Sequence, residues 1–560
     1  MFDKSSLLQQ LQALSFPEKE YWVVAGGAMV LHGFLPQTHD IDLGCSTRLA
    51  DQLEQQGYAV SRCKDGTRKI SYSENIEIFE NWIEGTVETV DGVPVVCVDG
   101  LIQMKKKLGR EKDLADIALI EKNGELWYAW RLQAMIRCAT VSEKDTYNDT
   151  EFAKLREVMR ELFPLVHEKC IRRNFSRDCW VYELPGLDQS RSILLMSHHD
   201  VAPAEGQWEH EPFSGEIAEG RIWGRGTVDT KTPLFAEFSA LEELLEQGFC
   251  PPCNVFLASS HNEEQGGDGI PTALEYFKQR GIAFEVVLDE GGAVIDPPLG
   301  DMKCEKCAMV AVHEAGRYKL ICTAPGSNAH TGLTAAVKAS PTERMAGFIQ
   351  EAAAGDVFIR RLNPQVRAMF GHLAPHCRFP MNILFGNLWL FGGLLRKVMP
   401  KLNPQAKSMI GTTCSFNKIE GDKNRCTAEA SFRSVDRLDM EKDLAALRKT
   451  GEKYGVEIEV DISSEYHDPA DMNHPAFAYT RECIARVFPQ YPAAPFILPA
   501  GTDARTLTEI CPCVLRFAPI RLSAQQLASV HSENENIDLS AVTDAVAFYR
   551  DFLAHYSTAV

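Results

Sequence analysis

The sequence lacks several features that define whole classes of protein. Its most apolar stretch, NILFGNLWLFGGLL at residues 382–395, is shorter than the roughly 20 residues that span a bilayer, so we expect no membrane span. The opening residues, MFDKSSLLQQLQALSF, contain no continuous apolar core followed by a small-residue cleavage site, so we expect no export signal. Internal repeats and low-complexity tracts are also missing. Together these absences predict a globular protein located in the cytoplasm.

Positive charge is in deficit. The chain has 58 Lys and Arg against 77 Asp and Glu, a net charge of −19 over 560 residues. Because phosphate binding needs clustered Lys and Arg, we expect no nucleic acid as the main partner. Seventeen cysteines, an odd number without regular spacing, favour reduced thiols over a disulfide framework. With 45% hydrophobic and 24% charged residues, the chain is typical of a globular protein of several domains.

The pattern of strands and helices changes character near residue 125. The residues before this point predict a small α/β unit over residues 1–123, with a glycine turn after its first strand. Its expected elements are a helix at 5–14, strands at 21–25, 39–43 and 76–79, and a helix at 101–121.

Three short apolar runs follow, at residues 192–197, 254–259 and 284–288. Such runs are typical of parallel strands that are covered on both faces, and a helix at 233–248 separates the first two. We therefore predict a doubly wound α/β core, formed by residues 124–315 and 466–560. An α+β domain, expected at residues 316–465, interrupts it. The expected elements of this insertion are strands at 318–324, 414–420, 425–435 and 456–462, and helices at 341–354 and 441–454.

Ionisable residues gather directly after the three buried strands. Because the carboxyl ends of neighbouring parallel strands meet at one crevice, these side chains should converge there. A cluster of acids in one crevice repels itself unless cations compensate the charge, which favours one or two divalent metals. A His with carboxylates suits zinc, with manganese or cobalt as substitutes. The residues are His198 and Asp200, Glu263 and Glu264, and Asp289 with Glu290.

The spacing within these groups suggests a division of roles. His198 and Asp200 are two residues apart, which places both side chains on one face of an extended chain. Glu263 and Glu264 are adjacent, so a bend at the strand end would let one bind metal while the other reaches the metal-bound water. A hydrolase needs this combination of a Lewis acid and a general base.

Three motifs in this region, SHHDVAPAEGQWEHEPFSGEIAEGRIWGRGTVDTK, SSHNEEQGGDG and VVLDEGG, resemble those of metallopeptidase family M20. This family contains aminoacylases, carboxypeptidases and dipeptidases with two zinc ions, and the resemblance extends from about Ser192 to the C-terminus. It implies an enzyme that cleaves an amide or peptide bond next to a free carboxylate, with a metal-bridging water and a Glu base. The implied roles are a first metal on His198 and Asp289, a second on Glu264 and His531, a bridge by Asp229, general base Glu263 and an orienting Asp200.

In the same family the inserted domain acts as a lid that often dimerises, so the resemblance also implies a homodimer through this domain. His330 of GSNAHTGLT matches a histidine that stabilises the oxyanion of the tetrahedral intermediate. Asn424 and Arg433 resemble residues that bind the substrate carboxylate. The interval 356–409 resembles the enlarged lid of the carboxypeptidase S branch, whose substrates are peptides and N-acyl amino acids. Its apolar residues form either the core of the lid or an acyl pocket, and we favour the core.

The first 123 residues carry a second candidate site. Gly26 and Gly27 precede a helix, and Asp40 and Asp42 lie two apart on a strand, with Glu77 as a third carboxylate. Such acids can hold Mg²⁺ while a glycine turn approaches a triphosphate. The region resembles the minimal nucleotidyltransferase-like fold of antitoxin and AbiEii-type proteins. We favour a degenerate regulatory or docking module over an active transferase.

The sequence therefore supports three functions. The first is a dizinc hydrolase acting on a peptide or N-acyl amino acid. The second is a nucleotidyltransferase whose C-terminal part only senses a ligand, and the third is a peptide-binding protein on the M20 scaffold. Glu263 favours the first, because a binding protein needs no general base beside metal ligands.

Overall fold

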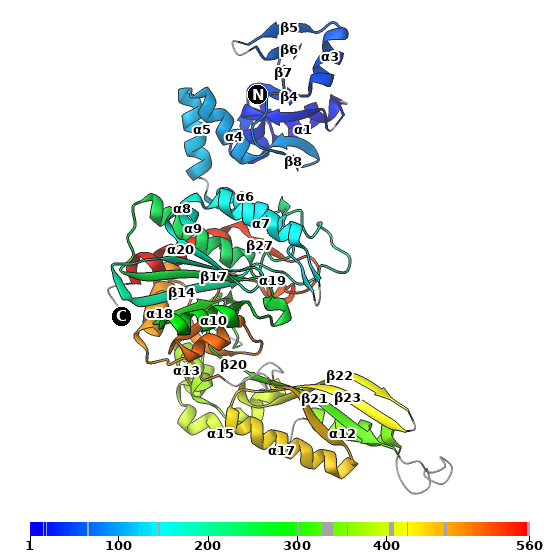
Figure 1. Cartoon of the computed structure of the whole chain (residues 1–560), viewed down its shortest axis with the longest axis vertical. Coiled ribbons are helices and arrows are strands. Elements are labelled where there is room, and N and C mark those ends of the chain that lie inside the picture. Colours follow the sequence, from blue (N-terminus) through cyan, green and yellow to red (C-terminus); the bar gives the residue numbers. More distant parts are fainter. Residues whose placement is uncertain are drawn as a thin grey trace. The chain divides into compact units, whose positions relative to one another are not determined.

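The chain forms two compact units, Met1–Arg131 and Leu132–Val560, shown in Figure 1. We describe each by itself. This computed structural model describes residues 1–14, 16–17, 19–63, 66–122, 124–143, 146–299, 302–326, 340–354, 357–402, 408–422, 424–463 and 467–556.

The Met1–Arg131 unit contains a seven-stranded sheet. Its order is β5 (Ala59–Arg62), β6 (Arg68–Ser73), β7 (Ile76–Glu80), β4 (Ile41–Cys45), β2 (Tyr21–Val24), β9 (Val93–Val96) and β8 (Val87–Val90). The three strands expected from the sequence are the central neighbours β7, β4 and β2, and β4 pairs with β7 in parallel. The other elements are β1 (Phe2–Asp3), β3 (Gln37–Thr38), α1 (Lys4–Ala13), α2 (Ala25–Leu31), α3 (Thr47–Gln55), α4 (Val98–Leu108) and α5 (Glu111–Lys122).

Two local predictions for this unit were wrong. The single helix expected at 101–121 is divided into α4 and α5, because Gly109 ends α4 with a φ of 62°, in the left-handed region. The expected glycine turn is instead the first turn of α2, which contains Gly26 and Gly27. A Cβ on Gly26 would lie 2.5 Å from Thr38 Oγ1, so the close approach of α2 to residue 38 explains this glycine.

The Leu132–Val560 unit is built on a nine-stranded mixed sheet. The three predicted strands are adjacent and parallel in the order β17 (Cys253–Ser260), β14 (Asp188–His198) and β18 (Val286–Asp289). Their carboxyl ends therefore lie at one edge, as expected. The remaining strands are β12 (Ile171–Phe175), β13 (Cys179–Leu184), β26 (Val514–Arg516), β20 (Cys307–Glu314), β19 (Val294–Ile295) and β25 (Ala493–Leu498).

Helices cover this sheet. The helix expected at 233–248 is α9 (Lys231–Glu246), which is buried along most of its length and packs against α20 (Leu539–His555). Other elements are α6 (Gly124–Ile136), α7 (Asp149–Leu162), α8 (Pro164–Lys169), α10 (Gly269–Arg280), α18 (Pro475–Val487), α19 (Ala524–Ala528), the 3₁₀ turns η1 (Glu263–Gln265) and η3 (Asp503–Glu509), and the short strands β10 (Ser142–Glu143), β11 (Thr146–Tyr147), β15 (Ile217–Ala218), β16 (Arg221–Trp223) and β27 (Asn536–Asp538).

The predicted insertion contains an antiparallel sheet in the order β22 (Thr413–Gly421), β23 (Arg425–Ser434), β21 (Gly316–Pro325) and β24 (Glu457–Ser463). Helices α12 (Pro341–Ala354) and α17 (Arg437–Tyr454) share a core with this sheet, and Figure 1 shows both helices beside it. All six of these elements were expected from the sequence.

The insertion is not a single packing unit. Four further segments, α13 (Pro364–Leu373), η2 (Ala374–His376), α14 (Met381–Gly386) and α15 (Leu388–Leu402), follow α12. Phe370 and Leu395 from these helices share a core with Met309 of β20 and Ile497 of β25. Since α12 and α17 already cover the four-stranded sheet, these helices bury their apolar sides against the nine-stranded sheet instead. Among the described residues, no helix is long and apolar enough to cross a membrane.

Candidate active site

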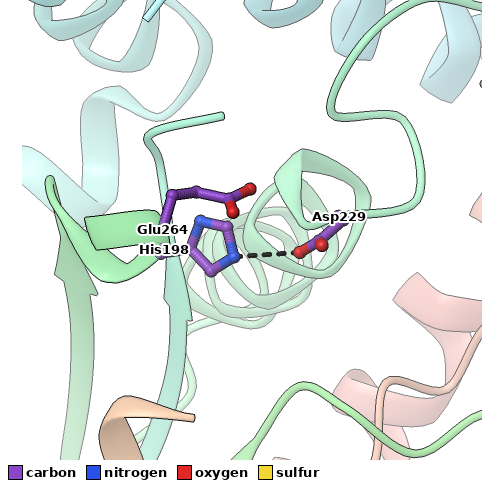
Figure 2. Close-up of side chains that lie close together, drawn as sticks. All are labelled: His198, Asp229 and Glu264. Carbon is purple, nitrogen blue, oxygen red and sulfur yellow. Dashed lines mark hydrogen bonds and ion pairs between the residues drawn. The ribbon is translucent and has the colours of Figure 1, made fainter. Parts of the chain in front are cut away.

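His198 is the last residue of β14, at the edge where the parallel strands end, and its side chain is buried. Its Nδ1 lies 2.9 Å from the backbone oxygen of Asp200. Because a carbonyl oxygen only accepts, Nδ1 carries the proton and Nε2 is directed at Asp229, 3.0 Å from Oδ1 (Figure 2). When the ring is neutral, Nε2 therefore directs a lone pair toward this carboxylate, as a metal ligand would.

The carboxylate of Asp229 lies between two histidines. Its Oδ2 is 3.0 Å from Nε2 of His531, and the same nitrogen is 3.0 Å from Oε2 of Glu264. In the part of the chain that the structure describes, one group of three or more potential ligands has atoms within 4.8 Å of one another: His198, Asp229 and Glu264. Figure 2 shows these three side chains together. Asp229 thus contacts both histidines, as a carboxylate that bridges two metal ions would have to do.

Asp200 fixes the turn that carries both glutamates. This residue is fully buried, and its Oδ1 and Oδ2 each accept a backbone N–H at 3.2 Å, from Glu263 and Glu264 respectively. These two residues begin the 3₁₀ turn η1, so the chain bends shortly after β17 ends at Ser260, as expected. Asp200 therefore holds both glutamates through its carboxyl group, and its Oδ1 also lies 3.3 Å from Nδ1 of His198.

The third strand, β18, brings two acids to the site rather than one. Asp289 is buried and interacts with the side chain of Thr502, and burial raises its pKa to about 7. Burial also raises the pKa of the neighbouring Glu290, and the charges acting most strongly on it include Asp229, Asp289 and Glu263. Glu290 is thus a site residue to which the sequence interpretation gave no role. The sequence feature that could have indicated this role is the pair of adjacent acids in LDEGG.

Burial and neighbouring charges have opposite effects on the pKa values of the site histidines. Burial alone would lower the pKa of His198, but the carboxylates of Asp200 and Asp229 outweigh it and raise the pKa well above its usual value. Hydrogen bonds with Asp229 and Glu264 raise the pKa of His531 to about 10. Burial raises the pKa of Glu263. Without other cations, the histidines must hold protons to balance the acids.

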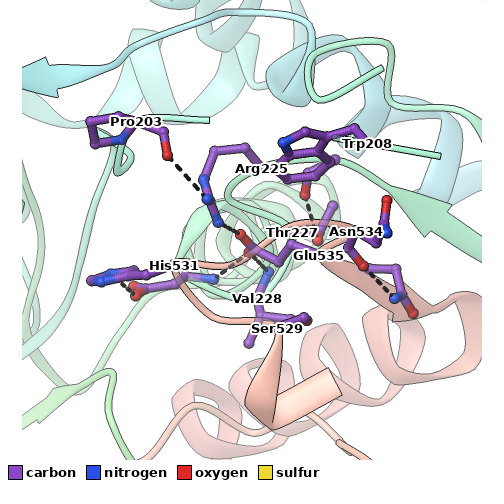
Figure 3. A network of polar contacts seen from close by, with 12 residues as sticks. Pro203, Trp208, Arg225, Thr227, Val228, Ser529, His531, Asn534 and Glu535 are labelled. Atoms are coloured by element: carbon purple, nitrogen blue, oxygen red, sulfur yellow. Dashed lines mark hydrogen bonds and ion pairs between the residues drawn. The ribbon is translucent and has the colours of Figure 1, made fainter. Parts of the chain in front are cut away.

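A buried ion pair supports the site from behind. Glu535 accepts a hydrogen bond from Arg225, and its Oε1 accepts the backbone N–H of Val228 at 2.7 Å and of Asp229 at 3.1 Å (Figure 3). Glu535 lies four residues after His531, so one carboxylate links the segments that carry two site residues. The sequence interpretation missed both partners. The signal was one of the two glutamates in SENEN, and it resembles any exposed loop charge.

The predicted substrate-binding residues lie apart. Arg433 is near the carboxyl end of β23 and donates a hydrogen bond to the backbone oxygen of Pro499, while burial lowers its pKa. Asn424 directly precedes β23, where its N–H donates to Asp422 at 2.7 Å. The two residues are nine positions apart, which is about 30 Å along a strand, so in one chain they cannot bind the same carboxylate. His330 lies outside the described residues.

The predicted N-terminal acids are partly brought together. Asp42 of β4 is in register with Glu77 of β7, and burial, Asp40 and Glu77 raise the pKa of Asp42 to about 6. Glu77 also forms an ion pair with Lys69 at 2.6 Å. Among the described residues of this unit, no three potential ligands have atoms within 4.8 Å of one another, as His198, Asp229 and Glu264 do.

The fold and this constellation are those of an α/β hydrolytic enzyme with its site at the carboxyl ends of parallel strands. A family model described as Peptidase family M20/M25/M40 matches residues 194–555. The chain therefore belongs to this family and is an enzyme of the M20 peptidase type. The match begins after the Met1–Arg131 unit, which it does not cover.

Curated relatives and solved structures agree with this assignment. The chain is 28% identical over 447 residues to an N-fatty-acyl-amino acid synthase/hydrolase PM20D1 of Xenopus tropicalis, covering 76% of this chain and 85% of the relative. It is also 28% identical to a probable carboxypeptidase S-like 2 of Dictyostelium discoideum, covering 75% and 83%. An M20 family metallo-carboxypeptidase from Sulfolobus solfataricus shares the fold with a TM-score of 0.55 and 19% identity, covering 77% of this chain and 99% of that structure. Human carnosine dipeptidase 1 gives a TM-score of 0.52 at 14% identity, covering 78% and 98%.

Proposed function

We propose that this enzyme hydrolyses the amide bond of a peptide or N-acyl amino acid, next to a free carboxylate, with two divalent metals. The observation that carries the proposal is the convergence of His198, Asp229, Glu264 and His531, with Asp229 within 3.0 Å of both histidines. Glu263 adds a carboxylate on the same turn as Glu264.

The residues present fit two metal ions. Oε1 of Glu264 and Oδ2 of Asp289 are buried and have no hydrogen-bond partner, which is a costly arrangement unless a cation is bound. Nitrogen and carboxylate ligands suit zinc, with manganese or cobalt as alternatives. Asp229 would bridge the two metals. His198 with Asp289 or Glu290 would complete the first site, and Glu264 with His531 the second.

The chain's own residues then perform the proton transfers. Bound metals supply Lewis acidity, which activates water and polarises the substrate carbonyl. Glu263 accepts a proton from the attacking water and donates it to the leaving amine, as a carboxylate next to the metal ligand Glu264 can do. Asp200 holds the backbone N–H of Glu263, so it fixes the position of this base.

We assign the binding of the substrate carboxylate to a residue of the inserted domain. Arg433 contacts the chain at Pro499, three residues before Thr502, which interacts with Asp289. We assign the substrate carboxylate to this guanidinium, because it offers two parallel donors. We keep His330 as the oxyanion donor. We no longer propose that Asn424 binds the same substrate carboxylate as Arg433 of its own chain, because the two residues lie too far apart. The relatives named for N-fatty-acyl amino acids and for carboxypeptidase S support an amphiphilic N-acyl amino acid as the substrate class.

The proposal is tested by a hydrolysis panel on purified full-length protein. Metal content is measured first, and then N-acyl amino acids, their carboxamide analogues and dipeptides are compared. We expect activity that chelation abolishes, that zinc restores, and that falls strongly for the carboxamides. A protein that binds metal and N-acyl amino acids but cleaves none of the panel would contradict the proposal and favour a binding function.

For the Met1–Arg131 unit, we infer a regulatory or docking role rather than nucleotidyl transfer with Mg²⁺. The ion pair between Lys69 and Glu77 supports this, because it neutralises one of the three acids that a metal would need.

A further inference from the structure

Helices α14 and α15 and the residue pair before them expose an apolar surface. Five large apolar side chains there are half to four-fifths exposed. They are Phe379 (77%), Ile383 (47%), Trp389 (80%), Leu390 (59%) and Leu394 (55%). We call these five residues the α14–α15 face. Since exposed apolar side chains normally occur singly, a group of five on consecutive helices marks an interaction surface.

The inner sides of the same helices fix which way this face points. Phe385 and Leu395 are buried in the core that these helices share with β20 and β25. Leu390, Leu394 and Lys397 follow one another at intervals of four and three residues, so they lie along one side of α15. The outer side of a surface helix is ordinarily polar, whereas here it exposes Leu390 and Leu394 before it reaches Lys397.

The charge around the face is unlike that of the rest of the chain. From Val357 to Ile419 the sequence contains nine Lys and Arg and no Asp or Glu, although the whole chain has a net charge of −19. Arg378 precedes Phe379, and Arg396 and Lys397 follow Leu394, and all three are exposed. Basic residues therefore stand at both ends of the apolar face, with no acid between them.

We propose that the α14–α15 face docks onto the surface of an anionic lipid membrane. An exposed Trp with Leu, Ile and Phe suits shallow insertion at the boundary between headgroups and acyl chains. The flanking Arg and Lys suit anionic headgroups, and their long side chains can reach the headgroups while the apolar side chains insert. The acids elsewhere on the chain are screened beyond about 8 Å at physiological salt.

A second copy of this chain fits the face less well. A symmetric contact between two such faces would place the same basic residues opposite one another, and it offers no acids to pair with them. An anionic lipid surface satisfies both the apolar and the basic parts. This proposal does not rest on the hydrolase assignment, because it uses no residue of the candidate active site.

The test is cosedimentation of the full-length protein with vesicles. Vesicles of phosphatidylcholine alone are compared with vesicles containing one third phosphatidylglycerol, at low and high salt. We expect binding to the anionic vesicles that high salt weakens. The variant Trp389→Glu/Leu394→Glu should lose at least about tenfold in partition, because it removes apolar insertion and adds negative charge. Arg396→Gln/Lys397→Gln should lose about 25-fold on anionic vesicles, at about fivefold for each charge.

Matched controls come from exposed leucines elsewhere in the chain. Leu187 is 78% exposed and Leu438 is 63% exposed, so Leu187→Glu and Leu438→Glu each add one negative charge without touching the face, and combined in one chain they add the same two charges as the test variant. Both should bind vesicles as the wild type does, and all variants should keep hydrolysis of a water-soluble substrate.

Two results would overturn the proposal. One is vesicle binding that is absent in the wild type or equal in the Trp389→Glu/Leu394→Glu variant. The other is a wild-type dimer, measured by sedimentation equilibrium, that this variant dissociates. That second result would identify the face as a contact between copies instead.

Discussion

Arg225 and Glu535, 310 residues apart in the sequence, form a buried ion pair with Nη1 and Oε2 2.6 Å apart. The second oxygen of Glu535 accepts the N–H of Asp229, the carboxylate that we assign as the metal bridge. The backbone oxygen of Glu535 also accepts the N–H of Gly224 at 2.8 Å. The pair therefore fixes the loop of Asp229 and the loop of His531 relative to each other.

We expect Glu535→Gln to weaken metal binding by about 10- to 100-fold, because the ligand loops lose a shared support. Leaving Arg225 buried and unpaired should also lower the free energy of unfolding by about 3–5 kcal/mol. Zinc titration of the metal-free protein and urea denaturation measure the two effects. Glu533→Gln is the control. This exposed residue of the same loop only holds the N–H of Gln207, so the substitution should change metal affinity little. Equal affinities for wild type and Glu535→Gln would refute the positioning role.

The division of labour on η1 gives a second prediction. Glu263→Gln should lower kcat by about 10²- to 10⁴-fold and leave both metals bound, because Glu263 moves a proton rather than holding a cation. Asp229→Asn should instead lose both metals, since each depends on the bridge. Metal analysis by mass spectrometry after dialysis, together with steady-state kinetics, separates the two. If Glu263→Gln emptied a metal site, the roles of Glu263 and Glu264 would have to be exchanged.

The acid pair after β18 gives a third prediction. Glu290→Gln should weaken the first metal more than Asp289→Asn does, because the main charges acting on Glu290 are the site residues Asp229, Asp289 and Glu263, whereas Asp289 is held by Thr502 and Arg516. We expect a loss of about tenfold or more in affinity for Glu290→Gln, measured by zinc competition with a chelating dye. The opposite order would restore Asp289 as the ligand of the first metal.

Much of this organisation could be predicted from the sequence because it depends on local pattern. The runs that form β14, β17 and β18 are apolar throughout, and a parallel sheet brings the residues after them to one edge. This rule placed His198 and Glu264 near each other although they are 66 positions apart.

Other features depend on packing that no local pattern carries. Alternation along a strand assigns faces, but it no longer applies where β18 ends, so it could not choose between Asp289 and Glu290. The pairing of Arg225 with Glu535 is set by the folded path of two distant loops. The apolar residues of α14 and α15 were expected in the core. Phe385 and Leu395 are buried there, but the outward direction of Trp389 depends on which side of the helix meets β20 and β25.

The final prediction concerns Asp42 and the pH dependence of the N-terminal unit. Its pKa is raised from 3.8 to about 6 by burial, Asp40 and Glu77, so the folded state holds a proton that the unfolded state has lost between these pH values. The stabilisation by the protonated acid is therefore complete below about pH 4 and is lost as the pH rises through 6. Asp42→Asn keeps the neutral form and should raise protection of the β4 and β7 amides from hydrogen exchange at pH 7, but not at pH 4.

The response to Mg²⁺ distinguishes the two interpretations of this unit. If Asp40 and Asp42 belong to a degenerate module, Mg²⁺ should leave wild-type protection at pH 7 unchanged, because Lys69 already neutralises Glu77. The Asp40→Asn/Asp42→Asn variant should then hydrolyse amides at the wild-type rate, since the carboxylates to which we assign catalysis all lie between residues 132 and 560. Protection that Mg²⁺ raises only in the wild type, with pyrophosphate released from nucleoside triphosphates, would instead establish a second active site, because two-metal phosphoryl chemistry depends on such carboxylates.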